Sequence, residues 1–212
     1  PAALQTEAER VAQLHREEGL TVAVIEQEKI FNEFSSGTPD ASAYRRLMKM
    51  FYDRAEGNEN VRPRYLLLFG DGSYNNRKSM EKLHSPECNM LLTYQSKTSI
   101  DERESFVIED YFGFLENNSG EEIKVYKVCL GIGRFPISSI KNARLVVDKL
   151  YRYVHDKDFS SWKNNICIAA DDGDEAIHAE QADRGSDTLL LKNTSQPRLG
   201  FRVNKIYIDS YY

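Results

Sequence analysis

The sequence predicts an α/β fold with a mostly parallel sheet flanked by helices. Segments with apolar residues at helical spacing alternate with short β-branched or continuously apolar runs. The run YLLLFG at 65–70 is apolar on both faces, which is typical of a central parallel strand that helices cover on both sides. These two observations favour alternating strands and helices in one or two domains of ordinary size.

The first part of the chain predicts a helix, a strand and a second helix, in that order. Residues 2–17 carry apolar side chains at helical spacing until Gly19, and LTVAVIE at 20–26 predicts a strand. Thr38, Pro39 and Asp40 then indicate a helix start, with an N-cap, a proline at the first helical position and an acid in the first turn. We expect its core face to hold Ala43, Leu47, Phe51 and Ala55, and its exposed face Arg45, Arg46 and Lys49.

The middle of the chain is harder to assign. Residues 72–109 predict a long irregular stretch, broken by LLTYQS at 91–96, and a loop of that length in a compact domain is usually functional. DYFGFLE at 110–116 and VYKVCLGIGRF at 125–135 have strand-like composition. Between them, NNSGEE at 117–122 is a candidate hairpin turn.

The last third predicts a second set of alternating elements. Ser138 and Ser139 can cap a helix whose apolar stripe consists of Ile140, Ala143, Val147, Leu150 and Val154. WKNNICIAAD at 162–171 and NKIYID at 204–209 predict strands, and DEAIHAEQAD at 174–183 starts a helix between them. We place the domain boundary near Pro136, which predicts an N-terminal subdomain at 1–137 and the start of a second at 138–212.

Composition excludes several classes of function. The net charge of −5 and the mixing of acidic with basic residues leave no basic stripe for phosphate backbones, so we expect no nucleic-acid partner. No apolar run approaches the roughly 20 residues that span a bilayer, and PAALQTEAER at the start lacks the features of an export signal. A signal peptide could still precede Pro1 in a longer protein. The three cysteines are too far apart to indicate a disulfide framework.

Two glycine-rich turns are candidate nucleotide sites. GDGSY at 70–74 follows a strand but lacks the Lys-Ser/Thr of a phosphate loop, and GIGRFP at 131–136 has Pro136 where a dinucleotide motif needs its third glycine. Both are interpreted as tight turns, with Asp71 bonding to local amides. Asp71 nevertheless lies at the carboxyl end of a strand, where sites of open α/β sheets gather.

A second acidic cluster, CIAADDGDEAIHAE at 167–180, also lies at a strand end. It lacks calcium-loop spacing, and His178 stands alone, so the cluster predicts no zinc site. On spacing alone, Asp171 and Asp172 are turn residues, while Asp174 and Glu175 favour a helix N-terminus.

The three cysteines are candidate nucleophiles. Cys129 and Cys167 fall in apolar runs and are expected to be inert core thiols, whereas Cys88 lies near His84 in a loop and offers a weak candidate dyad.

Eight ordered blocks carry a family resemblance over nearly the whole chain. They are FNEFSSGTPDASAYRRLMKMFYDRA, PRYLLLFGDGSYNNR, LLTYQS, EDYFGFLE, GIGRFPISS, VVDKLYRYV, ICIAADDGD and NKIYID. The chain resembles the catalytic region of the gingipain-type cysteine peptidases, and within them the sortase-like members of the type IX secretion system. The resemblance implies a caspase-like α/β fold of two adjoining subdomains, the second incomplete.

The resemblance also implies a reaction. The sortase-like relatives cleave C-terminal sorting domains from exported proteins at the outer membrane or cell surface, and can pass the acyl group to an amine. A cysteine thiolate attacks the carbonyl, and a histidine protonates the leaving amine. Both catalytic residues of the family follow the strand that NKIYID resembles, so they would lie beyond Tyr212. We therefore expect this chain to be the N-terminal part of a peptidase and to be inactive alone.

Some site residues can be carried over from the family. Asp172, directly before Gly173, matches the acid that orients the catalytic histidine, and is the expected catalytic residue. Glu175, three residues before His178, matches the acid of a substrate-arginine pocket in the arginine-specific members, so both are expected in substrate binding. The reaction requires no cofactor. Structural calcium is an option for which Asp101, Glu109 and Asp110 offer oxygen ligands, but their spacing identifies no metal site.

The expected partners are a protein or peptide substrate, the remainder of the catalytic domain and other type IX secretion components. Two alternatives stay open on sequence grounds. One is a non-catalytic binding or scaffolding module that retains the peptidase fold. The other, a nucleotide-using enzyme, rests on the two glycine turns alone.

Overall fold

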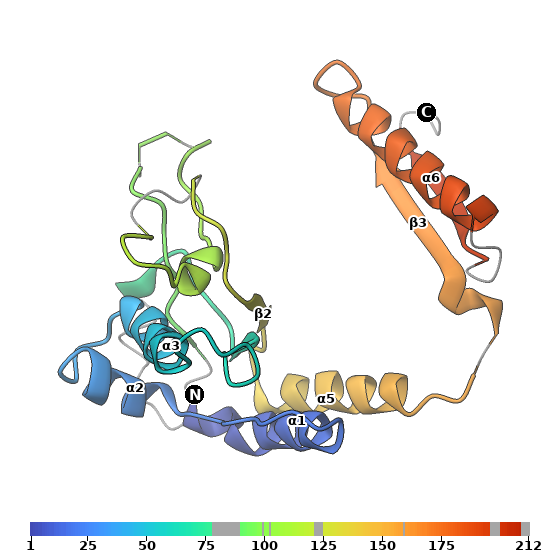
Figure 1. Ribbon diagram of the computed structural model, residues 1–212. Helices are drawn as coiled ribbons and strands as arrows, with labels where there is room; N and C mark the ends of the chain where they lie inside the picture. The colour runs from blue at the N-terminus through green and yellow to red at the C-terminus, as the bar shows by residue number, and fades with distance from the viewer. Residues whose placement is uncertain are drawn as a thin grey trace. The chain divides into compact units, whose positions relative to one another are not determined.

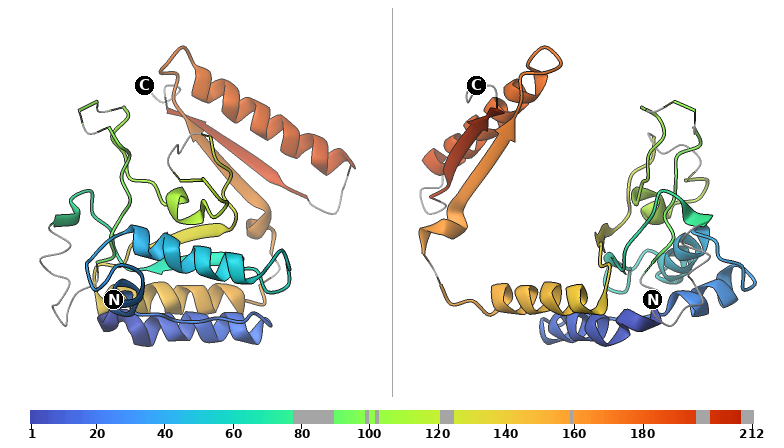
Figure 2. Two further views of the ribbon diagram at one scale, coloured as in Figure 1. Left: turned by 60° about the vertical axis from the view of Figure 1, so that its left-hand side comes forward. Right: turned by 180° about the vertical axis from the view of Figure 1, so that it is seen from behind.

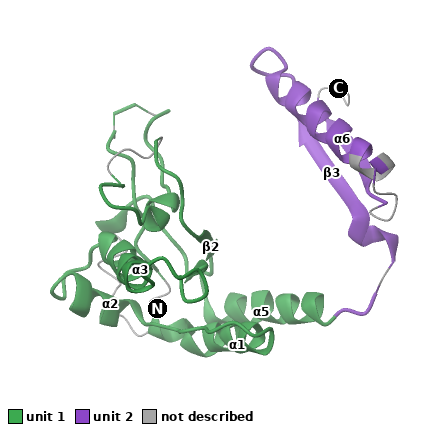
Figure 3. Ribbon diagram, in the orientation of Figure 1, with its two compact units in different colours: residues 1–155 green, residues 156–212 purple. Residues whose placement is uncertain are grey.

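The computed structural model describes residues 1–77, 90–98, 100–101, 103–120, 125–158, 160–195 and 200–208. The chain forms two compact units, Pro1–His155 and Asp156–Tyr212 (Figure 3). The predicted boundary at 137/138 concerns the subdomains of a whole peptidase and stays a prediction. Among the described residues, no helix is both long and apolar enough to cross a bilayer.

Unit 1 is built from helices around a short parallel sheet (Figure 1). Its elements are η1 (Ala2–Leu4), α1 (Gln5–Glu17), α2 (Gln27–Phe34), α3 (Ser42–Arg54), β1 (Tyr65–Phe69), η2 (Asp110–Gly113), β2 (Gly131–Phe135) and α5 (Ile140–Val154). β1 and β2 pair in parallel, with Tyr65 opposite Gly131 and Phe69 opposite Phe135. The strand predicted from YLLLFG is therefore present, although Tyr65 and Leu67 are exposed rather than covered.

Helices α1 and α5 lie side by side and cover one part of this sheet (Figure 2). Leu4 and Val11 pack with Phe69, Ala143 and Val147 in one buried cluster. Ser139 caps α5 as predicted, because its Oγ accepts a hydrogen bond of 3.1 Å from the backbone N of Asn142. The predicted α5 stripe is buried only at its centre, since Ile140 and Val154 are exposed.

Helix α3 and the segment around η2 form the largest core cluster on the other side of the sheet. Tyr44, Phe112 and Phe114 are buried there together with Leu68 and Leu92. DYFGFLE was wrongly predicted as a strand and instead forms η2. Residues 111–115 are all buried, so the apolar composition reflects a core segment rather than a two-faced strand.

Three further predictions about unit 1 were wrong. LTVAVIE forms no strand, because β-branched residues favour strands only where a pleated partner is available, and this segment has no ladder in the described residues. The α3 helix starts at Ser42, and Phe51 is 39% exposed. Residues 125–130 precede the β2 ladder, which starts only at Gly131, opposite the start of β1. The turn expected at 117–122 lies partly outside the described residues.

Two residues that were predicted to be exposed on α3 are half-buried. Arg45 donates from Nε to the carbonyl of Phe114 at 2.7 Å and from a terminal nitrogen to that of Ser119 at 2.7 Å. Lys49 contacts Asp53 and the side chain of Asn117. The helix α2 was not predicted, since its short sequence was assigned only by family resemblance.

Unit 2 is a parallel strand–helix–strand set, as predicted. It contains η3 (Ser161–Asn164), β3 (Asn165–Ala170), α6 (Ile177–Ser195) and β4 (Arg202–Tyr207). β3 and β4 run parallel, with Asn165 opposite Arg202 and Ala170 opposite Tyr207. α6 lies along the two strands (Figure 2). In the described part of this unit, the buried residues are Ala182 and Ser186, so its own core is thin.

Candidate functional site

The loop between β3 and α6 carries the predicted site residues of unit 2. β3 ends at Ala170, and α6 begins at Ile177. Between them, Asp174, Glu175 and Ala176 have φ angles of 53°, 59° and 61°. Each left-handed L-residue costs about 1–2 kcal/mol, so this turn is strained. Strain of this kind persists where the surroundings impose it, and it is common at functional sites.

Asp172 lies at the start of this strained turn. Its carbonyl accepts a 2.9 Å hydrogen bond from the backbone N of Ala176, and the residue is exposed. The next residue, Gly173, has little room for a side chain, because a Cβ there would lie 3.2 Å from Oδ2 of Asp171. The structure thus places Asp172 in the turn after a strand, as predicted, with an accessible position at the carboxyl end of the sheet.

His178 pairs with Asp174 rather than with Glu175. Its Nε2 lies 3.8 Å from Oδ2 of Asp174, and both side chains are largely exposed. Because α6 begins only at Ile177, Glu175 belongs to the left-handed turn and not to the helix. The predicted helix therefore starts later than expected, and the described contacts do not join Glu175 and His178 into one pocket.

A polar clamp ties α6 to β4 close to this turn. Asp183 on α6 accepts hydrogen bonds at one carboxylate oxygen from Lys205, with Nζ at 2.6 Å, and from the hydroxyl of Tyr207. The Lys205 and Tyr207 bonds hold the pKa of Asp183 below its ordinary value. The bond to Asp183 in turn raises the pKa of both Lys205 and Tyr207. We name Asp183, Lys205 and Tyr207 the α6–β4 clamp.

In unit 1, Arg134 forms hydrogen bonds to three chain segments that meet at the carboxyl end of the β1–β2 sheet. Its Nε donates to Oε1 of Glu109 at 2.7 Å, and its terminal nitrogens donate to the carbonyls of Gly70, Asp71 and Leu92 at 3.2–3.3 Å. The Arg134 side chain is 12% exposed. Oε2 of Glu109 is buried and lacks a hydrogen-bond partner among the described residues. Arg134, which belongs to GIGRFP, thus connects that motif to GDGSY, although the two are far apart in the sequence.

Asp71 behaves as the turn interpretation predicts. Its Oδ1 accepts from the backbone N of Gly72 at 2.9 Å, and its carbonyl accepts from the backbone N of Leu91 at 2.7 Å. Gly72 has no room for a side chain, because a Cβ would lie 2.8 Å from Cγ2 of Thr93. No phosphate-loop geometry is needed to explain these glycines.

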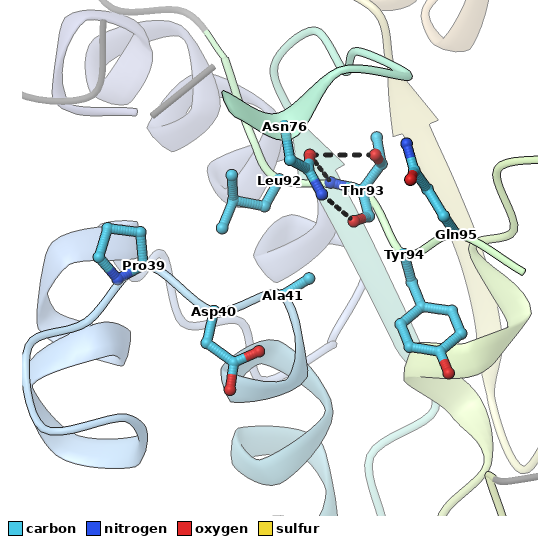
Figure 4. A pocket seen from close by; sticks show the side chains of 8 residues that line it. All are labelled: Pro39, Asp40, Ala41, Asn76, Leu92, Thr93, Tyr94 and Gln95. Atoms are coloured by element: carbon cyan, nitrogen blue, oxygen red, sulfur yellow. Dashed lines mark hydrogen bonds between the residues drawn. The ribbon is translucent and has the colours of Figure 1, made fainter. Parts of the chain in front are cut away.

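An open hollow of about 320 Å³ lies nearby in unit 1 (Figure 4). One wall consists of Pro39, Asp40 and Ala41 before α3, and the other of Asn76 and residues 92–95. The Asn76 side chain makes two hydrogen bonds with the backbone of Thr93. Its Nδ2 donates to the Thr93 carbonyl at 2.7 Å, and its Oδ1 accepts from the Thr93 backbone N at 3.1 Å. Burial raises the pKa of Tyr94, whose ring stacks on Tyr111. The hollow lacks a reactive pair and so indicates no chemistry of its own.

The structure describes some of the residues that were considered as metal ligands or as thiols. The described residues hold no group of three or more His, Cys, Asp or Glu side chains that could bind one metal ion, so Asp101, Glu109 and Asp110 form no such group. Cys129 is half-buried and Cys167 is exposed, so neither is the buried core thiol that was expected. Cys88 and His84 lie outside the described residues.

A comparison with known protein families tests the resemblance. The model of peptidase family C25, the gingipain family, matches residues 1–212. The chain belongs to peptidase family C25. The resemblance to gingipain-type cysteine peptidases is thereby confirmed over the whole sequence.

Comparison with solved structures agrees. A crystal structure of dimeric latent PorU from Porphyromonas gingivalis is similar to the chain at 42% identity, with a TM-score of 0.65. The match covers 76% of this chain and 16% of the PorU chain, so the C25 chain spans a small part of that protein. The predicted caspase-like α/β fold with mostly parallel strands is confirmed. No curated protein matches the chain.

Two groups in the C25 chain were not predicted from its sequence. Arg134 was considered only as part of a glycine turn, although a single arginine near the carboxyl end of a strand, two residues before Pro136, could have indicated a carbonyl-binding role. Asp183 was included in a helix without a role. Its partners are 22 and 24 residues away in the sequence, so the pairing depends on the register of β4.

Proposed function

We propose that the chain is the N-terminal part of the catalytic region of a type IX secretion sortase, a cysteine endopeptidase that removes C-terminal sorting domains from exported proteins. One observation carries this proposal: the C25 family match over residues 1–212, together with 42% identity to PorU. The site would lie at the outer membrane or cell surface. Its partners would be a protein substrate, the remainder of the catalytic domain and other type IX components.

In this proposal, the chain supplies the carboxylate that orients the catalytic histidine, and not the nucleophile. A cysteine thiolate and a histidine beyond these 212 residues would form the acyl-enzyme and protonate the leaving amine. Asp172 would accept a hydrogen bond from the histidine, fixing its tautomer and stabilising its cation. The exposed position of Asp172 at the carboxyl end of β3 supports this role, because such strand ends are where catalytic loops gather.

Glu175 and His178 are proposed to lie near the substrate. The strained turn presents Glu175 to solvent, so its carboxylate is available to a cationic substrate side chain. Asp174, which pairs with His178, is a second acid at the same place. Glu175→Gln should therefore lower the preference for peptides with Arg or Lys at the cleaved bond, and an unchanged preference would remove Glu175 from the pocket.

The first experiment compares cleavage of a mixed peptide pool by this chain and by a longer polypeptide that extends through the expected histidine and cysteine. Activity only in the longer form supports the proposal. Activity of the 212-residue chain alone would contradict it and would direct attention to Cys88 and His84.

A second experiment tests Asp172 in the longer polypeptide. Asp172→Asn should lower kcat by about 10²–10⁴-fold with little change in melting temperature, since a triad acid sets the tautomer of its histidine. Asp171→Asn is the matched control, because it removes the same charge from the neighbouring exposed position. Equal effects of both variants would contradict a specific role for Asp172.

A non-catalytic scaffolding module is the second candidate. A folded longer polypeptide that binds sorting-domain peptides but cleaves none would support this alternative over the peptidase.

A further inference from the structure

We propose that Asp183 is a positioning residue for Asp172, acting through the α6–β4 clamp. This inference rests on the proposed function, because it concerns the placement of the candidate catalytic acid. Asp183 would not touch the substrate. Its bonds to Lys205 and Tyr207 would hold α6 on β4, and thereby hold the turn that carries Asp172.

The clamp matters because few of the described side chains of α6 are buried. In the described part of the unit, the buried side chains are those of Ala182 and Ser186. On the same helix Leu190 and Leu191 are 48% and 69% exposed. These small buried residues let the helix approach the strands closely but bury little apolar area. The hydrogen bonds of Asp183 are therefore a main specific contact between α6 and β4.

The position of the clamp relates it to the candidate site. Tyr207 lies opposite Ala170 in the β3–β4 register, one residue before Asp171 and the turn. Asp183 lies six residues after Ile177, the first residue of α6, which is about 9 Å along the helix axis. The turn at 171–176 is thus anchored on one side by the paired end of β3 and on the other by a helix whose first two turns carry the clamp.

A small shift of that helix would disturb the proposed chemistry. In the proposed function, the catalytic histidine follows β4, and Asp172 must reach it within hydrogen-bond distance. The clamp links β4, which leads toward the histidine, to α6, which borders the turn of Asp172. A misplacement of about 1 Å far from the chemistry can lower a rate by about 10²-fold.

The test uses the longer polypeptide with Asp183→Asn, and with Asp187→Asn as control. Asp187 lies one turn further along α6 and carries the same charge, but in the described contacts it makes no hydrogen bond to Lys205 or Tyr207 and acts on them only through its charge. We expect Asp183→Asn to lower kcat by about tenfold with KM unchanged, and Asp187→Asn to change neither. Tyr207→Phe, which keeps the ring, should give a smaller loss of kcat in the same direction.

A double variant separates positioning from general stability. If Asp183 acts through Asp172, then adding Asp183→Asn to Asp172→Asn should cause no further loss of kcat. Losses that multiply, or a fall in melting temperature with kcat unchanged, would overturn the proposal.

Hydrogen exchange of the amides at 171–176 gives a readout that does not need activity. Asp183→Asn should speed exchange there, whereas Asp187→Asn should not. A wild-type polypeptide without peptidase activity would overturn the proposed function, yet faster exchange in Asp183→Asn would still support positioning of the turn. Unchanged exchange would overturn the positioning role, whatever the activity.

Discussion

At the scale of single residues, Arg134 is the contact whose loss should cost unit 1 most. Its guanidinium joins the end of β1, the segment at Leu92 and the carboxylate of Glu109 while remaining 12% exposed. Arg134→Ala would remove the guanidinium donors from a largely buried carboxylate and from the carbonyls of Gly70 and Leu92. We expect it to lower the free energy of unfolding by about 3–5 kcal/mol.

Denaturant unfolding of the 212-residue chain measures this loss. Arg134→Lys should recover only part of it, because an ammonium cannot reproduce the planar fork of donors. Arg152→Ala on the exposed surface of α5 is the control and should change stability by no more than about 0.5 kcal/mol. Equal losses for Arg134 and Arg152 would show that the Arg134 contacts do not form in solution.

Gly72 offers a second prediction at this scale. A Cβ there would lie 2.8 Å from Cγ2 of Thr93 and 3.3 Å from the Arg134 guanidinium. Gly72→Ala should therefore destabilise the chain by about 1–3 kcal/mol through overpacking. Gly133→Ala is the matched control, since a Cβ at Gly133 meets nothing within 4 Å. It should leave stability unchanged or raise it, and a similar loss in both variants would argue against the packing at Gly72.

At the scale of elements, the α6–β4 clamp predicts a pH dependence. The folded pKa of Asp183 is lowered by its bonds to Lys205 and then Tyr207, so its contribution is present above an unfolded value of about 3.9. That contribution is lost as pH falls through the folded pKa. Lys205 and Tyr207 have raised pKa values, so the clamp also weakens as pH rises beyond about 10.

Melting temperatures of the wild type and of Asp183→Asn, measured across pH, test this. The difference between them should be constant near neutrality, shrink as pH falls below the unfolded value of about 3.9, and disappear once Asp183 is protonated in the folded state. Because Asp183 and Lys205 are both exposed, high salt should also reduce the difference. A difference that does not shrink at all as the pH is lowered below about 3.9 would mean that Asp183 acts by packing rather than by charge.

The elements that the sequence predicted well are those with a strong local pattern. The helix at α5 has its cap at Ser139 and its buried centre at Ala143 and Val147, and both features are visible in the sequence. The strand prediction for LTVAVIE was wrong because a strand needs a paired strand beside it, and that pairing depends on the whole fold. The Asp172 turn could be predicted as a strand end. The clamp could not, because the side of β4 that faces α6 follows from the β3–β4 register.

At the scale of the whole molecule, the two units differ in how much of their stability they supply themselves. Unit 1 holds all three buried clusters found among the described residues, including Phe112 and Leu115, which are fully buried. In unit 2, the exposed apolar side chains include Ile177, Leu190 and Ile206. A parallel sheet is normally covered on both faces, so such a unit gains stability when further chain packs on it.

Hydrogen exchange by peptide segment can test this difference. In the 212-residue chain, amides of β3 and β4 should exchange faster than those of α5 and β1, because few apolar contacts oppose local opening of unit 2. In the longer polypeptide with the proposed catalytic residues, β3 and β4 should become protected while α5 and β1 change little. Equal protection of both units in the 212-residue chain would show that unit 2 is stable alone, and the remainder of the catalytic domain would then not be needed to complete its core.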